Sequence, residues 1–167
     1  YITMRKAGNY ATTIQFRANW GTMRSRYYSM TMRLSSDNLP SQAEVFRLYG
    51  YTSYDDVYRN INQVIMTLDN DGNLVTSTGV KIGKVTKGEF LEFTYAIDMV
   101  EKTIDIYVGD QLKAEDISFD KRMDSLYGLW LTIPASSTDG SLIIDGVMYN
   151  KLSEPYSPDG NFKSVYP

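Results

Sequence analysis

Apolar side chains recur at every second position across residues 91–97 and again across 104–108. A period of two places these side chains on one face of a β-strand and the intervening polar ones on the other face. Met99–Lys102 separates the two runs and is short enough to form a turn. The stretch from Phe90 to Val108 therefore predicts an antiparallel hairpin with one buried face. This hairpin constrains the fold more than any other feature of the chain.

Shorter alternating stretches recur along the chain, with turn residues between them. An Asp-Gly hairpin turn is predicted at Asp69–Gly72, and the tyrosine-rich segment 51–60 is predicted to be a long loop. No segment carries a sustained apolar stripe of helical period. These features predict an all-β domain, a two-sheet antiparallel β-sandwich of the jelly-roll kind. The predicted strands outside the hairpin are Tyr10–Asn19, Tyr28–Leu34, Glu44–Tyr51, Gln63–Leu68, Leu74–Val75, Lys81–Val85, Ile117–Phe119, Tyr127–Ile133 and Leu142–Tyr149.

The alternation ends near Leu152, and the remaining residues are punctuated by proline. A length of 167 residues suits one domain. We therefore expect a single β-sandwich domain over residues 1–152, followed by a linker or C-terminal tail over 153–167. A linker of this kind predicts that the domain is one module of a larger multidomain protein.

Composition excludes several classes of function. The net charge of −3 does not suit non-specific nucleic-acid binding, which needs a basic surface. No apolar run reaches the roughly 20 residues of a membrane-spanning helix, so membrane insertion is not expected. Cysteine and histidine are both absent, which excludes disulfides, thiolate catalysis, the usual zinc sites and a Ser-His-Asp triad. The 14 tyrosines, together with many Asn, Ser, Thr and Asp residues, favour an extracellular or cell-surface location.

Three segments resemble a known family. Ile97-Asp98, Ile104–Gly109 and Leu142–Val147 are similar to the last strands and turns of laminin-G-like domains, which belong to the concanavalin A-like lectin and glucanase superfamily. The resemblance spans residues 10–150, although the order of the turn residues differs at Gly109-Asp110 and Asp145-Gly146. It implies two antiparallel sheets packed face to face, one of them curved into a groove. Members of the superfamily bind glycans, cleave them or act as spacer modules, so the fold leaves these functions open.

The catalytic motifs of that superfamily are not reproduced. Laminarinase-type members carry Glu-x-Asp-x-x-Glu on one strand, whereas here Glu92 and Asp98 share a face but stand about 20 Å apart. Lys6–Tyr10 matches the Lys-Ala-Gly-x-Tyr motif of alginate-lyase-like members, but it lies at the N-terminal end and has no histidine to complete the set. We therefore predict that the chain is not an enzyme. A tyrosine-based polysaccharide lyase remains the alternative.

Three arginines are the main candidates for ligand binding. Arg17, Arg33 and Arg47 lie on the polar faces of separate predicted strands, and Tyr49 shares its face with Arg47. If these strands are neighbours, three guanidinium groups line one groove and suit the carboxylates or sulfates of an acidic glycan. Alternatively, each arginine covers apolar surface and pairs with a nearby carboxylate.

Aromatic residues at strand ends and in loops are the second set of candidates. Trp20, Tyr51 and Tyr54 are placed where binding residues collect, and their rings can pack on the C–H faces of sugars. Tyr28 and Trp130 are predicted to lie in the core instead.

A structural calcium ion is the one metal that the sequence suggests. Asp139 and Asp145 could join backbone carbonyls in a calcium site of the kind that some jelly rolls carry, and no other cofactor is expected. Taken together, these features predict a non-catalytic glycan-binding accessory module of a secreted or cell-surface bacterial protein, with a polysaccharide, anionic in character, as its partner. The alternative from another class is a structural spacer or adhesion domain of a surface or virion protein.

Overall fold

The computed structural model describes residues 1–17, 25–52 and 59–159. Every regular element within these ranges is a β-strand. No helix in the described residues is long and apolar enough to cross a membrane. The prediction of an all-β fold is confirmed.

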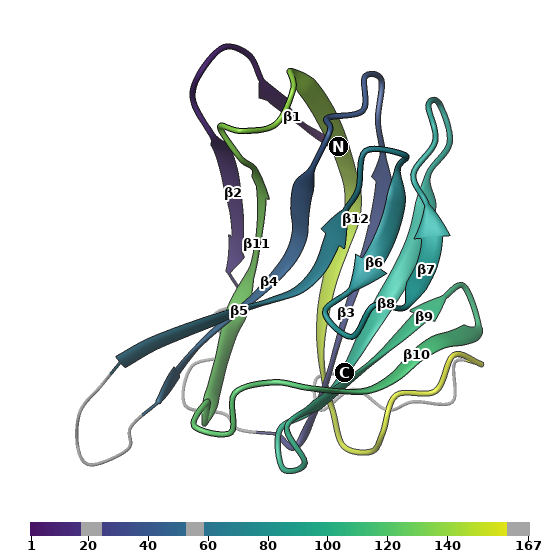
Figure 1. Ribbon diagram of the computed structural model, residues 1–167. Helices are drawn as coiled ribbons and strands as arrows, with labels where there is room; N and C mark the ends of the chain where they lie inside the picture. Colours follow the sequence, from purple (N-terminus) through teal and green to yellow (C-terminus); the bar gives the residue numbers. More distant parts are fainter. Residues whose placement is uncertain (18–24, 53–58, 160–167) are drawn as a thin grey trace.

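Twelve strands form two antiparallel sheets of six strands each, which pack face to face as a β-sandwich (Figure 1). Sheet A has the order β1-β12-β3-β8-β9-β10, and sheet B has the order β2-β11-β4-β5-β6-β7. The two last strands of the chain, β11 and β12, therefore lie inside the sheets, each between two strands formed much earlier in the sequence. The strands are β1 (Ile2–Lys6), β2 (Thr12–Arg17), β3 (Tyr27–Ser35), β4 (Ala43–Thr52), β5 (Arg59–Leu68), β6 (Asn73–Thr76), β7 (Lys81–Lys84), β8 (Leu91–Asp98), β9 (Thr103–Val108), β10 (Gln111–Ser118), β11 (Ser125–Ile133) and β12 (Gly140–Leu152).

The predicted hairpin is confirmed as β8 and β9. Ile97 pairs with Ile104 in the antiparallel register, and both side chains are buried in the core. The Asp98 carboxylate accepts hydrogen bonds from the amides of Val100 and Glu101 at 2.9 and 3.1 Å, which fixes the start of the turn. Although burial raises the pKa of Asp98, hydrogen bonds from Arg26 and from these amides outweigh it and hold the pKa below its ordinary value.

Several strand boundaries differ from the sequence prediction. β1 was not predicted, because this short strand at the edge of sheet A buries only two of its side chains. β10 begins at Gln111 rather than Ile117, since two register shifts against β9 break its alternation. At the two ends of the predicted loop 51–60, β4 continues to Thr52 and β5 begins at Arg59, and residues 53–58 lie outside the described residues.

The core lies between the sheets and is filled by the alternating apolar residues of both. Tyr28 belongs to it as predicted, and Tyr95 packs against Phe46 with 3.8 Å between ring centroids. The Tyr95 hydroxyl is fully buried and makes no hydrogen bond within the described residues. Burial raises the pKa of this phenol well above its ordinary value. Tyr95 therefore acts as a core phenylalanine with one unpaired polar atom.

Candidate functional site

The outer surface of sheet B brings together arginine and aromatic side chains from three neighbouring strands. Gly128 of β11 pairs with Arg17 of β2 on one side and with Tyr49 of β4 on the other. Trp130 pairs in the same way with Gln15 and with Arg47. Directly opposed residues share a face of the sheet. We call the resulting surface the tyrosine–arginine face, which comprises Arg17, Arg47, Tyr49, Tyr51, Tyr127 and Trp130.

Tyr49 is the centre of this face. Its ring lies 5.1 Å from Trp130, 5.4 Å from Tyr127 and 5.5 Å from Tyr51, measured between centroids. Its neighbours leave Tyr49 only 6% exposed, so it supports the surface, whereas the other three rings remain half-buried. The Tyr49 and Tyr51 hydroxyls are hydrogen-bonded at 3.1 Å, which raises the pKa of Tyr51 to about 12. The available aromatic surface is therefore that of Tyr51, Tyr127 and Trp130.

A local irregularity of β11 places Tyr127 on this face. The register against β4 shifts between Leu126 and Gly128, so Tyr127 is an extra residue in its strand. Gly128 is required next to it, because a Cβ at this position would collide with the carbonyl oxygen of Phe16 on β2. The bulge and the close strand approach together direct the Tyr127 ring toward Tyr49 and Tyr51.

Arg47 is bound within the face by its neighbours. Its Nε and Nη2 donate to the two Glu44 carboxylate oxygens at 2.9 and 2.8 Å, and its Nη1 donates to Asn62 at 2.6 Å. The hydrogen bonds that Arg47 donates to Glu44 raise the pKa of Arg47. Each nitrogen of the guanidinium is engaged, and a carboxylate offsets its charge. This agrees with the alternative expectation of a locally paired arginine.

Arg17 has a different environment. Its Nε and Nη2 donate to the Gln15 side-chain oxygen at 3.2 and 3.0 Å, and its guanidinium lies over the Tyr127 ring, 5.3 Å from the centroid. The side chain is exposed, and in the described part of the chain it has no carboxylate partner. A cation over an aromatic ring is a favourable arrangement that holds the guanidinium in place.

The predicted groove of three arginines does not form, because Arg33 lies on the other sheet. β3 belongs to sheet A, where Arg33 pairs with Asp145 at 3.1 Å and stacks over the Phe90 ring at 4.9 Å. The structure brings together Arg17, Arg47, Tyr49 and Tyr51 from the predicted set and separates Arg33 from them.

The remaining aromatic predictions have different outcomes. Trp20 and Tyr54 lie outside the described residues. Trp130 is not a core residue, since it lies half-buried on the outer face against Tyr49. The alternation of Leu129, Leu131 and Ile133 would have placed Trp130 on the polar face. Tyr127 was not predicted, because a bulge is not visible in the alternation.

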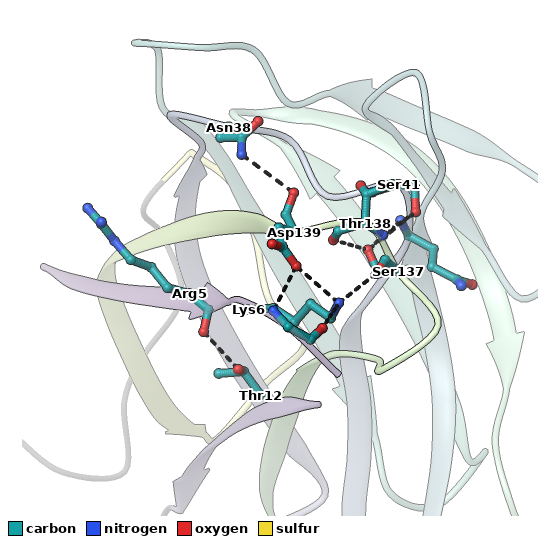
Figure 2. A network of polar contacts seen from close by, with 10 residues as sticks. Arg5, Lys6, Thr12, Asn38, Ser41, Ser137, Thr138 and Asp139 are labelled. Atoms are coloured by element: carbon teal, nitrogen blue, oxygen red, sulfur yellow. Dashed lines mark hydrogen bonds and ion pairs between the residues drawn. The ribbon is translucent and has the colours of Figure 1, made fainter. Parts of the chain in front are cut away.

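Asp139, one of the two predicted calcium ligands, contacts a lysine ammonium (Figure 2). Lys6, at the end of β1, is 5% exposed, and its Nζ donates to the carbonyl oxygens of Gly8 at 2.6 Å and Ser137 at 2.8 Å. The Asp139 carboxylate lies 3.3 Å from the same nitrogen. Calcium also binds carbonyl and carboxylate oxygens. Here the oxygens of Gly8, Ser137 and Asp139 surround the Lys6 ammonium instead.

Asp145, the other predicted ligand, does not approach Asp139. Asp145 lies six positions after Asp139 in the sequence, within β12, and it is paired with Arg33. Within the described ranges, no group of three or more Asp or Glu residues could hold a metal ion. The described structure therefore gives Asp139 and Asp145 two separate cationic partners from the chain itself.

A pocket on sheet A is lined by several carboxylates. A pocket of about 370 Å³ lies where β8 and β9 meet the segment after β12, and Pro155 and Tyr156 form part of its wall. Asp98, Glu101, Asp105 and Asp116 line this pocket. Burial raises the pKa of Asp105, and nearby Asp116 and Asp98 raise it further. We call this the acidic pocket, and Arg26 pairs with two of its carboxylates, Asp98 and Glu101.

The two six-stranded antiparallel sheets form a β-sandwich, and the outer surface of sheet B is aromatic and cationic. Solved structures with this arrangement include a sialidase, with a TM-score of 0.64 and 8% identity over 89% of this chain and 15% of that chain. A mutant of Trypanosoma rangeli sialidase displaying trans-sialidase activity has a TM-score of 0.55 and 10% identity, covering 93% of this chain and 27% of that one. The chain thus spans less than a third of either sialidase.

The alginate lyase AlyC3 has a TM-score of 0.50 and 10% identity, over 83% of this chain and 74% of that chain. At such identities the likenesses show the fold alone. The sequence matches no family model and no curated protein. These structural neighbours are two sialidases and an alginate lyase.

Proposed function

We propose that this chain is a non-catalytic glycan-binding module of a secreted or cell-surface bacterial protein, built on a concanavalin A-like sandwich with features of laminin-G-like domains. The tyrosine–arginine face is the observation that carries the proposal. Half-buried rings of Tyr51, Tyr127 and Trp130 lie together on one sheet, beside the exposed cation of Arg17. Aromatic faces pack on the C–H surfaces of sugars, and the polar groups at their edges can bond sugar hydroxyls. The carbohydrate-active neighbours on the same fold support this assignment.

The chemistry of the face favours binding over catalysis. A glycosidase needs two carboxyl groups on either side of the sugar bond, and Glu44, the carboxylate that the described residues bring to this face, is bound to Arg47. A tyrosine base needs a lowered pKa, whereas the pKa of Tyr51 is raised to about 12. The Lys6–Tyr10 segment, which matched a lyase motif, uses its lysine to join β1 to the β11–β12 connection. These observations favour the module over a tyrosine-based lyase.

A glycan array tests the proposal directly. We expect binding to a defined group of polysaccharides, and we expect Tyr51→Ala and Tyr127→Ala each to weaken it several-fold, since each aromatic contact contributes about 0.5–1.5 kcal/mol beyond its buried area. Tyr107→Ala is the matched control, because Tyr107 is a half-buried tyrosine on sheet A, away from the face. Its binding should equal that of the unchanged chain.

The same array separates the proposal from its alternatives. Binding to no glycan would remove the proposal and leave the spacer or adhesion domain as the alternative. A chain that releases new reducing ends or unsaturated products from laminarin, alginate or pectin is an enzyme. Equal binding by the Tyr51, Tyr127 and Tyr107 variants would place the sugar site elsewhere on the molecule.

A further inference from the structure

The two arginines of the tyrosine–arginine face differ in how their charges are balanced. Arg47 forms a bidentate pair with Glu44 and also bonds Asn62, so its charge and its donors are used within the protein. Arg17 bonds only the neutral amide oxygen of Gln15 in the described part of the chain. Among the described residues, Arg17 is therefore the cation on this face that no neighbouring carboxylate offsets.

The position of Arg17 joins that charge to the aromatic surface. Its guanidinium lies over Tyr127, and the Tyr127 ring meets the edge of Tyr51 with 5.2 Å between centroids. A sugar ring packed on Tyr51 and Tyr127 would have its outer substituents within reach of this guanidinium. The planar fork of an arginine matches a carboxylate or a sulfate with two parallel hydrogen bonds.

We infer that the tyrosine–arginine face recognises a glycan unit that carries a carboxylate or sulfate group, and that Arg17 is the residue that selects this group. The inference rests on the proposed function and adds the charge of the ligand and the residue that reads it. Arg47 supports the surface through Glu44 and does not contact the anion. This assigns the anion to one arginine out of the three that the sequence suggested.

The charge distribution of the molecule favours a local rather than a general attraction. The chain carries a net charge of −3, and the acidic pocket on sheet A places several carboxylates on the opposite outer surface. The net charge therefore gives a polyanion no general attraction to the protein, so local contacts on sheet B must hold it. On that face, Arg47 offsets the charge of Glu44.

Calorimetry with matched ligand pairs tests the inference. The first pair is polygalacturonate and its methyl ester, which share a sugar and differ in the charge of the carboxyl group. The second pair is dextran sulfate and dextran, which tests sulfate in place of carboxylate. We expect the unchanged chain to bind the anionic member of at least one pair more tightly than the neutral member, and to bind it more weakly as salt rises.

Arg17→Gln and Arg5→Gln give a charge-matched comparison, since each removes one positive charge from an exposed arginine. Arg17→Gln is expected to lower the affinity for the anionic ligand at least about tenfold, the fold-change for losing a hydrogen bond to a charged group. Arg5→Gln should change it less than about threefold, because Arg5 lies on β1 of sheet A, away from the tyrosine–arginine face.

Equal losses in the Arg17 variant and in the charge-matched control would overturn the inference, because the attraction would then be general. Equal affinity of the unchanged chain for charged and neutral members of both pairs would overturn it as well, while leaving glycan binding intact. Binding to no glycan, on the array or in calorimetry, would overturn the proposed function together with the inference.

Discussion

Replacing Lys6 with methionine is expected to lower the free energy of unfolding by about 2–4 kcal/mol. The substitution keeps a long unbranched side chain and removes the ammonium group. That group donates to the carbonyl oxygens of Gly8 and Ser137 at 2.6 and 2.8 Å, and hydrogen bonds from charged donors contribute about 1.5–3 kcal/mol each. The cost of burying the ammonium in the unchanged protein offsets part of this sum.

The ion pair with Asp139 contributes little to that total. The Asp139 side chain is 62% exposed, and exposed pairs contribute about 0–1 kcal/mol. Asp139→Asn, which retains an oxygen acceptor, should therefore cost less than about 1 kcal/mol. Urea unfolding of both variants, followed by circular dichroism, measures the difference between them.

Calcium gives a second measurement on the same site. Because the Lys6 ammonium already contacts these oxygens, we expect millimolar calcium to leave the unfolding midpoint of the unchanged chain where it is. A cost for Lys6→Met no greater than that for Asp139→Asn would refute the reasoning. So would a rise of the midpoint with calcium that Asp139→Asn abolishes.

Three further predictions follow from individual residues. Tyr95→Phe should leave the thermal midpoint unchanged or raise the stability by up to about 1 kcal/mol, since it removes a buried hydroxyl without a described partner; a clear loss of stability would show that the hydroxyl is bonded. Gly128→Ala should destabilise the fold by about 1–3 kcal/mol in urea unfolding, because its Cβ would collide with the Phe16 carbonyl of the adjacent strand. Full stability in this variant would mean that β2 and β11 can separate at little cost. The pKa of Asp98 is lower in the folded chain than its ordinary value of 3.8, so its ionised form stabilises the fold fully above that value and this contribution disappears as pH falls through the folded pKa. Asp98→Asn should therefore lower the unfolding midpoint more at pH 7 than at pH 2, and an equal effect at both values would contradict the assigned pKa direction.

The sequence predicted the hairpin of β8 and β9 because both the alternation and the turn are local. Each residue of β8 that pairs with β9 has its cross-strand partner only a short distance away in the sequence. The local pattern therefore contains most of the information that sets the register of this hairpin. The assignment of strands to sheets is not local. β3 pairs with β8 and β12, and its Thr31 bonds Thr94 across 63 positions of the chain. Alternation gave the face of Arg33 on its strand, but it could not show that this strand belongs to sheet A.

The candidate site was predictable only in part, for similar reasons. The polar-face positions of Arg17, Arg47 and Tyr49 followed from alternation, and these residues share one surface. Tyr127 reaches that surface through a bulge, which requires the approach of β2 at Gly128 and is invisible in a pattern of period two. Arg47 pairs with Glu44, which is three positions away on the same strand. Regular alternation would place these two residues on opposite faces of the strand. Register shifts of β4 against β5 bring them together.

The order of the strands has a consequence for synthesis on the ribosome. β12 lies between β1 and β3, and β11 lies between β2 and β4, so both sheets lack an interior strand until residues 125–152 have left the exit tunnel. Before that point, β4 to β7 and β8 to β10 can pair as meanders, whereas β1 and β2 have no strand beside them. Nascent chains grow at roughly 5–20 residues per second, so the edges of β3 and β4 remain exposed for several seconds. During this interval the chain is open to pairing with a neighbouring nascent chain on the same polysome, and the sandwich closes only when its last two strands arrive.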